Sequence, residues 1–188
     1  MFGMEPVTRV GVTVTFLRMD RPPVDLAPAL PIASQVVRVE APTVGFYRYL
    51  YNAVGAEYVW WLRRTMADVD LKALLREPLV SIHVLYNGGE PAGFYELDAR
   101  TWPTVNLSYF GLMPHMIGNG AGFPFLRHSV DTAWRMGAQG VTVNTCTADH
   151  ARALPAYLRA GFYVIRQAKE LWSVPVRLGL RIPEHLKL

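Results

Sequence analysis

The chain has 188 residues, of which 51% are hydrophobic and 18% are charged, and it contains a single cysteine, Cys146. This composition excludes a disordered chain and a disulfide-bonded scaffold, and the length suits one globular domain covering residues 1–188. A lone cysteine favours a cytoplasmic protein. The net charge of +4 is spread along the chain without a dense Lys/Arg run, so we expect no nucleic-acid partner.

The sequence also predicts no membrane partner. No apolar run approaches the roughly 18 residues that a membrane-spanning helix needs. The N-terminal segment "MFGMEPVTRVGVTVTFLRMD" carries charges throughout, which is not the pattern of a secretory signal.

The first half of the chain is predicted to start with a strand at 10–19, where β-branched residues alternate. A proline-rich surface segment follows, and "VVRVE" at 36–40 fits either a short strand or a continuation of that segment. Helical patterns occupy 42–55 and 69–77. The aromatic segment between them, 56–66, fits either a helix or an irregular path.

The second half has a clearer pattern of alternating and helical periodicity. In chain order it predicts a β-hairpin at 78–99 with a turn at 87–89, a strand at 104–113, a helix at 121–136, a strand at 140–146, a short helix at 149–161 and a strand at 162–172. Because Pro155 removes a backbone hydrogen bond, we expect the short helix to start late or to kink. The chain is therefore predicted to be a mixed α/β domain.

A glycine cluster separates the strand at 104–113 from the helix that follows it. Gly118, Gly120 and Gly122 fit a simple turn, and they also fit an anion site made of backbone N–H groups at a helix start. The chain lacks the G-K-[ST] of a P-loop, and Phe123 stands where G-x-G-x-x-G needs its third glycine. Both departures disfavour a nucleotide-phosphate enzyme.

Two motifs carry a resemblance to a known family. Residues 115–120, "HMIGNG", resemble the loop Q/R-x-x-G-x-G/A, with His115 in place of Gln or Arg. Residues 150–162, "HARALPAYLRAGF", resemble N-x-x-A-x-x-x-Y-x-x-x-G-F, with His150 in place of Asn. Together they resemble the GNAT superfamily of acyl-CoA N-acyltransferases, in a bacterial branch, over about Pro78 to Leu171.

The resemblance implies an acetyl-CoA-dependent N-acetyltransferase with the GNAT acyl-CoA N-acyltransferase fold. In that fold a central, mostly antiparallel sheet, flanked by helices, holds the co-substrate between two splayed strands. A small-molecule or peptide primary amine would attack the thioester directly in a ternary complex. Relatives pair through C-terminal strands, so a homodimer through the tail after Trp172 is one form the chain could take. A non-catalytic acyl-CoA-binding or regulatory module on the same fold is the alternative function.

The resemblance also assigns residues to the co-substrate. The implied cofactor-binding residues are Phe110, Leu112, Met113, Ile117, Gly118, Asn119, Gly120, Ala121, Gly122, His150, Ala153 and Tyr157. The oxyanion would be held by a backbone N–H near Leu112. No metal is expected, because the five histidines and one cysteine show no ligand spacing.

For catalysis, the resemblance makes Tyr157 the proton donor to the departing thiolate, against the alternative of a tyrosine that only packs in the core. A general base is less evident, because Asn106 stands where related proteins often carry Glu. Glu96 is the first choice and Asp98 the second, on the same side of one strand, with an ordinary solvent-facing carboxylate as the alternative. His83 and His150 are further options.

The remaining reactive or bulky residues have simpler expected roles. Cys146 is predicted to be a buried, inert thiol. Most of the aromatic residues near 47–61 are expected to pack in the core, while the resemblance implies that this region helps to wall the acceptor site. The residues concerned are Tyr47, Tyr49, Tyr51, Tyr58, Trp60 and Trp61.

Overall fold

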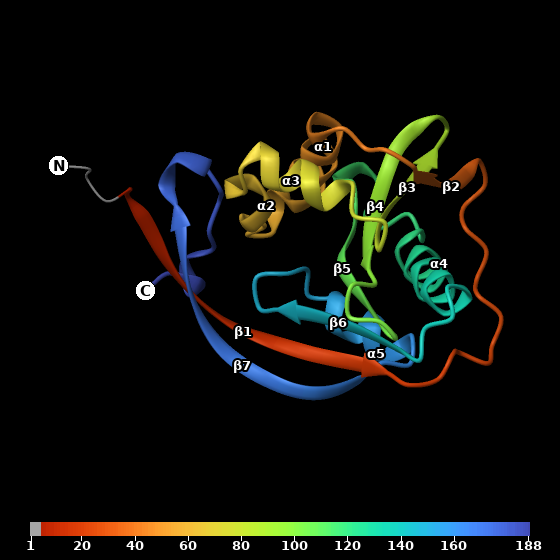
Figure 1. The fold of residues 1–188 in the computed structure, drawn as a ribbon. Coiled ribbons are helices and arrows are strands. Elements are labelled where there is room, and N and C mark those ends of the chain that lie inside the picture. The colour runs from red at the N-terminus through yellow and green to blue at the C-terminus, as the bar shows by residue number, and fades with distance from the viewer. Residues whose placement is uncertain (1–4) are drawn as a thin grey trace.

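The structure is a computed structural model that describes residues 5–188. Residues 1–4, which belong to the segment predicted not to be a secretory signal, lie outside the described residues. Figure 1 shows the course of the chain. Its main elements are β1 (Val7–Met19), β2 (Ser34–Val39), α1 (Val44–Val54), α2 (Leu62–Thr65), α3 (Asp68–Leu75), β3 (Val80–Asn87), β4 (Glu90–Asp98), β5 (Thr104–Leu112), α4 (Gly122–Arg135), β6 (Gly140–Cys146), α5 (Ala153–Arg159) and β7 (Tyr163–Pro175). Short 3₁₀ turns lie at Gly55–Glu57, Pro114–Met116, Val176–Leu178 and Glu184–Leu186.

The strands form one seven-stranded sheet in the order β2-β3-β4-β5-β6-β1-β7. Every neighbouring pair is antiparallel except β5 and β6, which run parallel with α4 as their connection. The predicted mixed α/β class and mostly antiparallel sheet are therefore confirmed. The N-terminal strand β1 lies between the two last strands, with Val14 opposite both Cys146 and Ala168.

The elements follow the predicted order, and the structure decides two points that the sequence left open. The aromatic segment after α1 breaks into a 3₁₀ turn and the four-residue helix α2. Helix α5 begins only at Ala153, so Pro155 falls in the first turn, where a missing N–H costs no helical hydrogen bond. The expected late start of this helix is confirmed.

Helices cover both faces of the sheet, with α4 on one face and α1 to α3 on the other (Figure 1). Strand β5 has a bulge at Ser108, where its register with β4 shifts between Glu96 and Leu97. The bulge changes which residues of β5 face α4 and which face α1. Before the bulge Leu107 packs under α4; after it Phe110 packs there, while Tyr109 joins the α1 side. The bulge thus directs Tyr109 toward the α1 side of the sheet.

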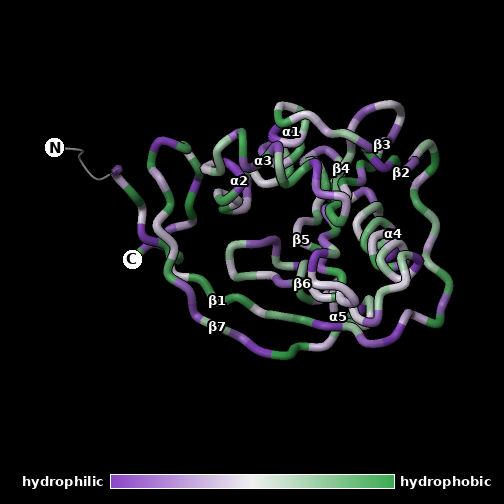
Figure 2. The backbone as a smooth tube through the Cα atoms, viewed as in Figure 1, coloured by the Kyte–Doolittle hydropathy of each residue, from purple (hydrophilic) through white to green (hydrophobic). Residues whose placement is uncertain are grey.

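The C-terminal tail folds back onto its own chain. Strand β7 runs beside β1 as far as Pro175, and Figure 2 shows that its middle is hydrophilic while β1 is largely hydrophobic. Farther on, Leu186 packs against the buried Val10, and the Leu188 N–H donates to the Arg9 carbonyl at 3.1 Å. The tail thereby covers the end of β1.

Candidate active site between the splayed strands

Strands β5 and β6 separate partway along their length. They pair from Thr104 opposite Gly140 to Leu107 opposite Val143, and the pairing then ends although both strands continue. A cavity of about 990 Å³ occupies the gap and the space on either side of it. Its lining comes from β5, β6, β1, β7, α4, α5 and the connection between α1 and α2. The expected splay of these strands is present.

The edge of β5 that faces the gap offers free backbone groups. Met113 donates its N–H to the Ala92 carbonyl at 2.9 Å, and the Gly111 carbonyl lies against Gly93 on the same side. Because backbone groups alternate along a strand, the N–H and C=O groups of Phe110 and Leu112 point into the gap. Both residues line the cavity, whereas the side chain of Met113 is buried in the core under α1.

The glycine loop has the backbone shape of an anion cradle. Gly118 and Gly120 have φ of +89° and +78°, and a Cβ built on either would meet no atom within 4 Å. Positive φ favours glycine, and the open space leaves room for a ligand. Helix α4 begins directly afterwards at Gly122, so its first unpaired N–H groups face the same region.

Two predicted donors of the cradle are used within the loop. Ile117 and Asn119 give their N–H groups to Pro114 and Met116 at 3.3 Å, as part of a 3₁₀ turn. Ala121 is fully buried in the core, so only its backbone is available. The usable donors therefore begin at Gly118 and Gly120 and continue into the first turn of α4.

Two arginines that the sequence analysis did not single out border the same region. Arg152 and Arg159 line the cavity, and the guanidinium of Arg159 lies 3.9 Å from the ring centroid of Phe123. Such a stacked guanidinium keeps its charge while its orientation is fixed. The glycine loop thus shares its end of the cavity with positive charge.

Tyr157 lies in the cavity wall on α5, next to Ala153, which also lines it. The side chain is nearly buried, packs edge-on against Phe162 at 5.9 Å, and its hydroxyl has no hydrogen-bond partner within residues 5–188. Burial raises the pKa of Tyr157 above its usual value, and the negative charge of Asp149 makes a smaller contribution in the same direction. The phenol therefore stays protonated at neutral pH and is able to donate.

His150 also lines the cavity, where its Nδ1 accepts the Arg152 N–H at 3.1 Å. This bond holds the turn that leads into α5. His83 lies elsewhere, stacked on Tyr95 with ring centroids 4.6 Å apart and hydrogen-bonded to Ser81. It does not line the cavity.

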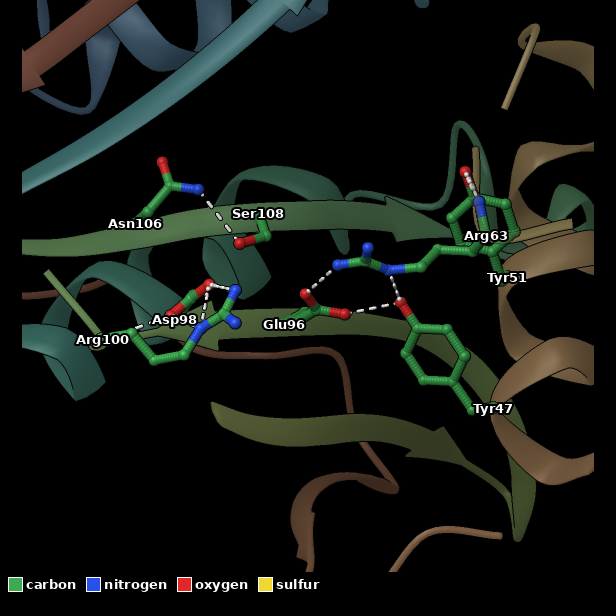
Figure 3. A network of polar contacts seen from close by, with 8 residues as sticks. All are labelled: Tyr47, Tyr51, Arg63, Glu96, Asp98, Arg100, Asn106 and Ser108. Carbon is green, nitrogen blue, oxygen red and sulfur yellow. Dashed lines mark hydrogen bonds and ion pairs between the residues drawn. The ribbon is translucent and has the colours of Figure 1, made fainter. Parts of the chain in front are cut away.

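Glu96, the first choice for general base, is held in a buried network (Figure 3). Its Oε2 accepts the Tyr47 hydroxyl at 2.5 Å and its Oε1 accepts from Arg63 at 2.9 Å, with the glutamate fully buried. It is therefore not a solvent-facing carboxylate. It also does not line the cavity, so the structure does not bring it together with Tyr157.

The second choice, Asp98, forms a bidentate pair with Arg100 and also lies off the cavity (Figure 3). Asn106 donates to the Ser108 hydroxyl and accepts from the Thr142 hydroxyl, each at 3.0 Å. These residues form a polar strip on the sheet, outside the lining of the cavity except for Ser108.

The sequence analysis missed Asp149, although it directly precedes the motif at 150–162. Its carboxylate lines the cavity, and its Oδ2 accepts the Thr145 hydroxyl at 2.7 Å and the Cys146 N–H at 2.9 Å. The Trp60 indole N–H faces Oδ1 at 3.4 Å. The signal available in the sequence was an acidic residue between the predicted strand at 140–146 and this motif.

The aromatic residues divide between the core and the cavity. Tyr47 is fully buried and Tyr49 is exposed on the surface, and neither lines the cavity. Four others form much of the wall on the α1 side of the sheet. They are Tyr51, Tyr58, Trp60 and Trp61.

Cys146 is half-buried and borders the cavity as well, where its surroundings favour the protonated thiol. Burial, with a further contribution from the charge of Asp149, raises its pKa to about 12. The thiolate is therefore scarce at neutral pH, which disfavours a covalent acyl-cysteine route.

Two further features bear on the type of site. In the part of the chain from 5 to 188, no group of three or more His, Cys, Asp or Glu side chains is arranged to hold a metal ion. Over the same residues, every helix is too short or too polar to pass through a lipid bilayer.

The sequence profile of the Acetyltransferase (GNAT) family matches residues 47–162. A search of curated protein sequences found no match. Among solved structures, the GCN5-related N-acetyltransferase from Kribbella flavida is similar with a TM-score of 0.61 and 17% identity, over 93% of this chain and 63% of that one. The GCN5-related N-acetyltransferase from Sphaerobacter thermophilus has a TM-score of 0.58 and 19% identity, over 89% and 51%.

A putative acetyltransferase of the GNAT family from Novosphingobium aromaticivorans is also similar, with a TM-score of 0.57 and 16% identity over 87% and 66% of the two chains. At these identities the likeness concerns the fold. The chain spans between half and two thirds of the length of these three structures.

Proposed function

The chain belongs to the acetyltransferase (GNAT) family, and on this premise we propose that it is an N-acetyltransferase. It transfers the acetyl group of acetyl-CoA to a primary amine, by direct attack within a ternary complex. The acceptor is a small molecule or a peptide. The lone thiol of Cys146 fits a cytoplasmic enzyme of this kind.

The observation that carries the proposal is a single cavity that passes through the sheet between β5 and β6. On the α4 side its lining includes Gly118, Gly120 and Tyr157, and on the α1 side it includes Trp60 and Tyr109. A co-substrate bound on one side and an acceptor bound on the other would therefore meet in the gap. Holding two reactants in contact in this way removes much of the entropic part of the barrier.

The residues around the gap suit acetyl-CoA. The free backbone groups of Phe110 and Leu112 would pair with the amides of the pantetheine arm as a neighbouring strand does. Gly118 and Gly120 leave open the space that a side chain would fill, and with the start of α4 they would hold the pyrophosphate. Arg152 and Arg159 would add positive charge.

The transfer needs a proton for the departing sulfur and a stabilised oxyanion. Tyr157 supplies the proton, because its hydroxyl is uncommitted and stays protonated. The Leu112 N–H, which points into the gap, is the donor for the oxyanion. The acceptor amine enters from the α1 side, along the wall formed by Tyr58, Trp60 and Trp61.

The first experiment measures acetyl-CoA binding by calorimetry on wild type and Gly120→Glu. We expect a loss of at least about 100-fold, because a negative side chain would occupy the cradle and like charges in contact cost several kcal/mol. Gly89→Glu is the matched control, since Gly89 also has a positive φ, +90°, and open space but lies in the hairpin turn. Equal binding by all three proteins would contradict the site.

The second experiment measures turnover with a free-thiol assay on wild type and Tyr157→Phe. We expect kcat to fall by about 100-fold with little change in the Kd of acetyl-CoA, as for the loss of a general acid. Tight binding without turnover of any amine would instead support the alternative, a non-catalytic acyl-CoA-binding module.

A further inference from the structure

We propose that Asp149 is the carboxylate that binds the acceptor amine and takes its proton during acetyl transfer. The proposal deepens the proposed function and rests on it. It gives to a residue on the β6–α5 connection the task that the sequence analysis assigned to Glu96.

The composition of the cavity wall restricts the choice. Among the described residues, 5–188, only Asp149 and Glu170 are carboxylates that line the cavity. Glu170 lies on β7 opposite Val12, accepts the Trp172 indole N–H at 2.8 Å and is exposed. Asp149 instead follows β6 directly, and its charge is close enough to act on Tyr157. It is the lining carboxylate that faces Trp60, on the side from which the acceptor enters.

The two carboxylate oxygens of Asp149 differ in the hydrogen bonds that they accept. Oδ2 accepts two hydrogen bonds of ordinary length, from Thr145 and from the Cys146 backbone. Within residues 5–188, the one hydrogen-bond contact of Oδ1 is with the Trp60 indole N–H, at a distance of 3.4 Å that is long for a hydrogen bond. A carboxylate oxygen has capacity for more than one donor, so Oδ1 remains able to accept from an ammonium group.

Trp60 holds its place opposite this oxygen because Gly55 makes room for it. A Cβ on Gly55 would lie 2.5 Å from the Trp60 side chain. The indole also packs against Tyr51 and Tyr109, with ring centroids 5.2 and 5.1 Å away. The ring therefore has little freedom, and its face offers a favourable surface for a cation beside Oδ1.

The chemical step balances with acetyl-CoA as the only co-reactant. The bound ammonium gives one proton to Asp149 Oδ1, and the lone pair thus freed forms the C–N bond to the thioester carbonyl carbon. The acylated nitrogen then loses a second N–H proton to solvent. The C–S bond then breaks, and the departing sulfur takes a proton from the Tyr157 hydroxyl. After the N-acetylamine and free coenzyme A are released, Asp149 gives its proton to solvent and Tyr157 takes one proton from solvent.

The test is Asp149→Asn in the full chain, with phenethylamine, spermidine and triglycine as acceptors and acetyl-CoA as donor. Asparagine keeps an oxygen for Thr145 and for the Cys146 N–H, and removes the charge that accepts the proton. We expect kcat/KM to fall by about 100-fold or more, the range for a lost general base, with an unchanged Kd for acetyl-CoA. The deficit should shrink as the pH rises, because more of the amine then arrives unprotonated.

Two controls separate chemistry from structure. Thr145→Val removes the hydroxyl that holds Oδ2 but keeps the carboxylate, and we expect it to lose less than tenfold. Asp70→Asn makes the same chemical change at an exposed position of α3, off the cavity, and should stay within about threefold of wild type. A similar large loss in Thr145→Val would show that the turn, and not the carboxylate, matters, and would overturn the assignment.

The remaining outcomes also decide the matter. Full activity of Asp149→Asn, or a loss confined to Glu170→Gln, would overturn the role of Asp149 while leaving the proposed function standing. Failure of wild type to acetylate any of the three amines, despite binding acetyl-CoA, would overturn the proposed transfer and the assignment with it. Should Asp149→Asn not fold, restoration of turnover to Asp149→Ala by added formate supports the role, and no restoration contradicts it.

Discussion

Glu96 and Arg63 form an ion pair on the α1 side of the sheet, with 2.9 Å between the guanidinium nitrogen and the carboxylate oxygen. The glutamate side chain is fully buried and the arginine side chain is 15% exposed. The Tyr47 hydroxyl completes the contacts of the carboxylate (Figure 3). Arg63 also reaches over the Tyr109 ring, with 5.1 Å between the guanidinium carbon and the ring centroid. The network ties α1 and α2 to β4 and β5.

We therefore expect Arg63→Met to destabilise the fold by about 3 to 5 kcal/mol, because it leaves the Glu96 charge buried without its partner. Urea unfolding measures the change. The double variant Arg63→Met with Glu96→Gln should recover a large part of the loss, since the unpaired charge is then absent. Additive losses in the double variant would contradict this coupling.

The second prediction concerns stability in acid. Burial, together with the positive charges of Arg38, His128 and Arg135, lowers the pKa of His83 from about 6.5 to about 4. The folded state therefore binds this proton less readily than the unfolded chain does. The contribution to stability is complete above pH 6.5 and is lost as the pH falls from 6.5 toward 4, by roughly 3 kcal/mol in all.

Urea unfolding at pH 7, 6 and 5 measures this slope, and His83→Phe is the control. The phenyl ring keeps the stack on Tyr95 but cannot take up a proton. We expect the variant to lose less stability than wild type between pH 7 and pH 5. Parallel curves for the two proteins would show that other groups cause the acid sensitivity.

The third prediction tests how closely the Trp60 side chain packs against Gly55. Gly55 ends α1 with a φ of −83°, which any residue can adopt, so the effect of Gly55→Ala is purely steric. The added methyl would lie 2.5 Å from the Trp60 side chain, and we expect a cost of about 1 to 3 kcal/mol from overpacking. Gly45→Ala, in the same helix with open space at its Cβ, is the matched control and should be neutral or slightly stabilising.

Tryptophan fluorescence reports the movement directly. A shifted emission maximum in Gly55→Ala, with none in Gly45→Ala, is the expected result. If the proposed role of Asp149 holds, Gly55→Ala also lowers kcat/KM. Unchanged stability and emission in Gly55→Ala would mean that Trp60 is free to move aside.

The sequence by itself determined the features that depend on neighbouring residues. The alternation of β-branched residues, the glycines of the hairpin turn at 87–89 and the position of Pro155 were enough to predict strands, a tight turn and a late helix start. The glycine loop and the motif around Tyr157 were enough to identify the family. All of these follow from backbone preferences within a few residues of each other, so a linear pattern records them.

The tertiary structure decided the placement of residues that are distant in the chain. The position of β1 between β6 and β7, the enclosure of Glu96 by Tyr47 and Arg63, and the meeting of Trp60 with Asp149 across 89 positions depend on how the sheet is assembled. The bulge at Ser108 belongs to the same class, because it appears only when β5 pairs with β4. The burial and the partners of a charged side chain depend on its whole surroundings. The sequence therefore did not show that Glu96 is fully buried, paired with Arg63 and Tyr47, and outside the lining of the cavity.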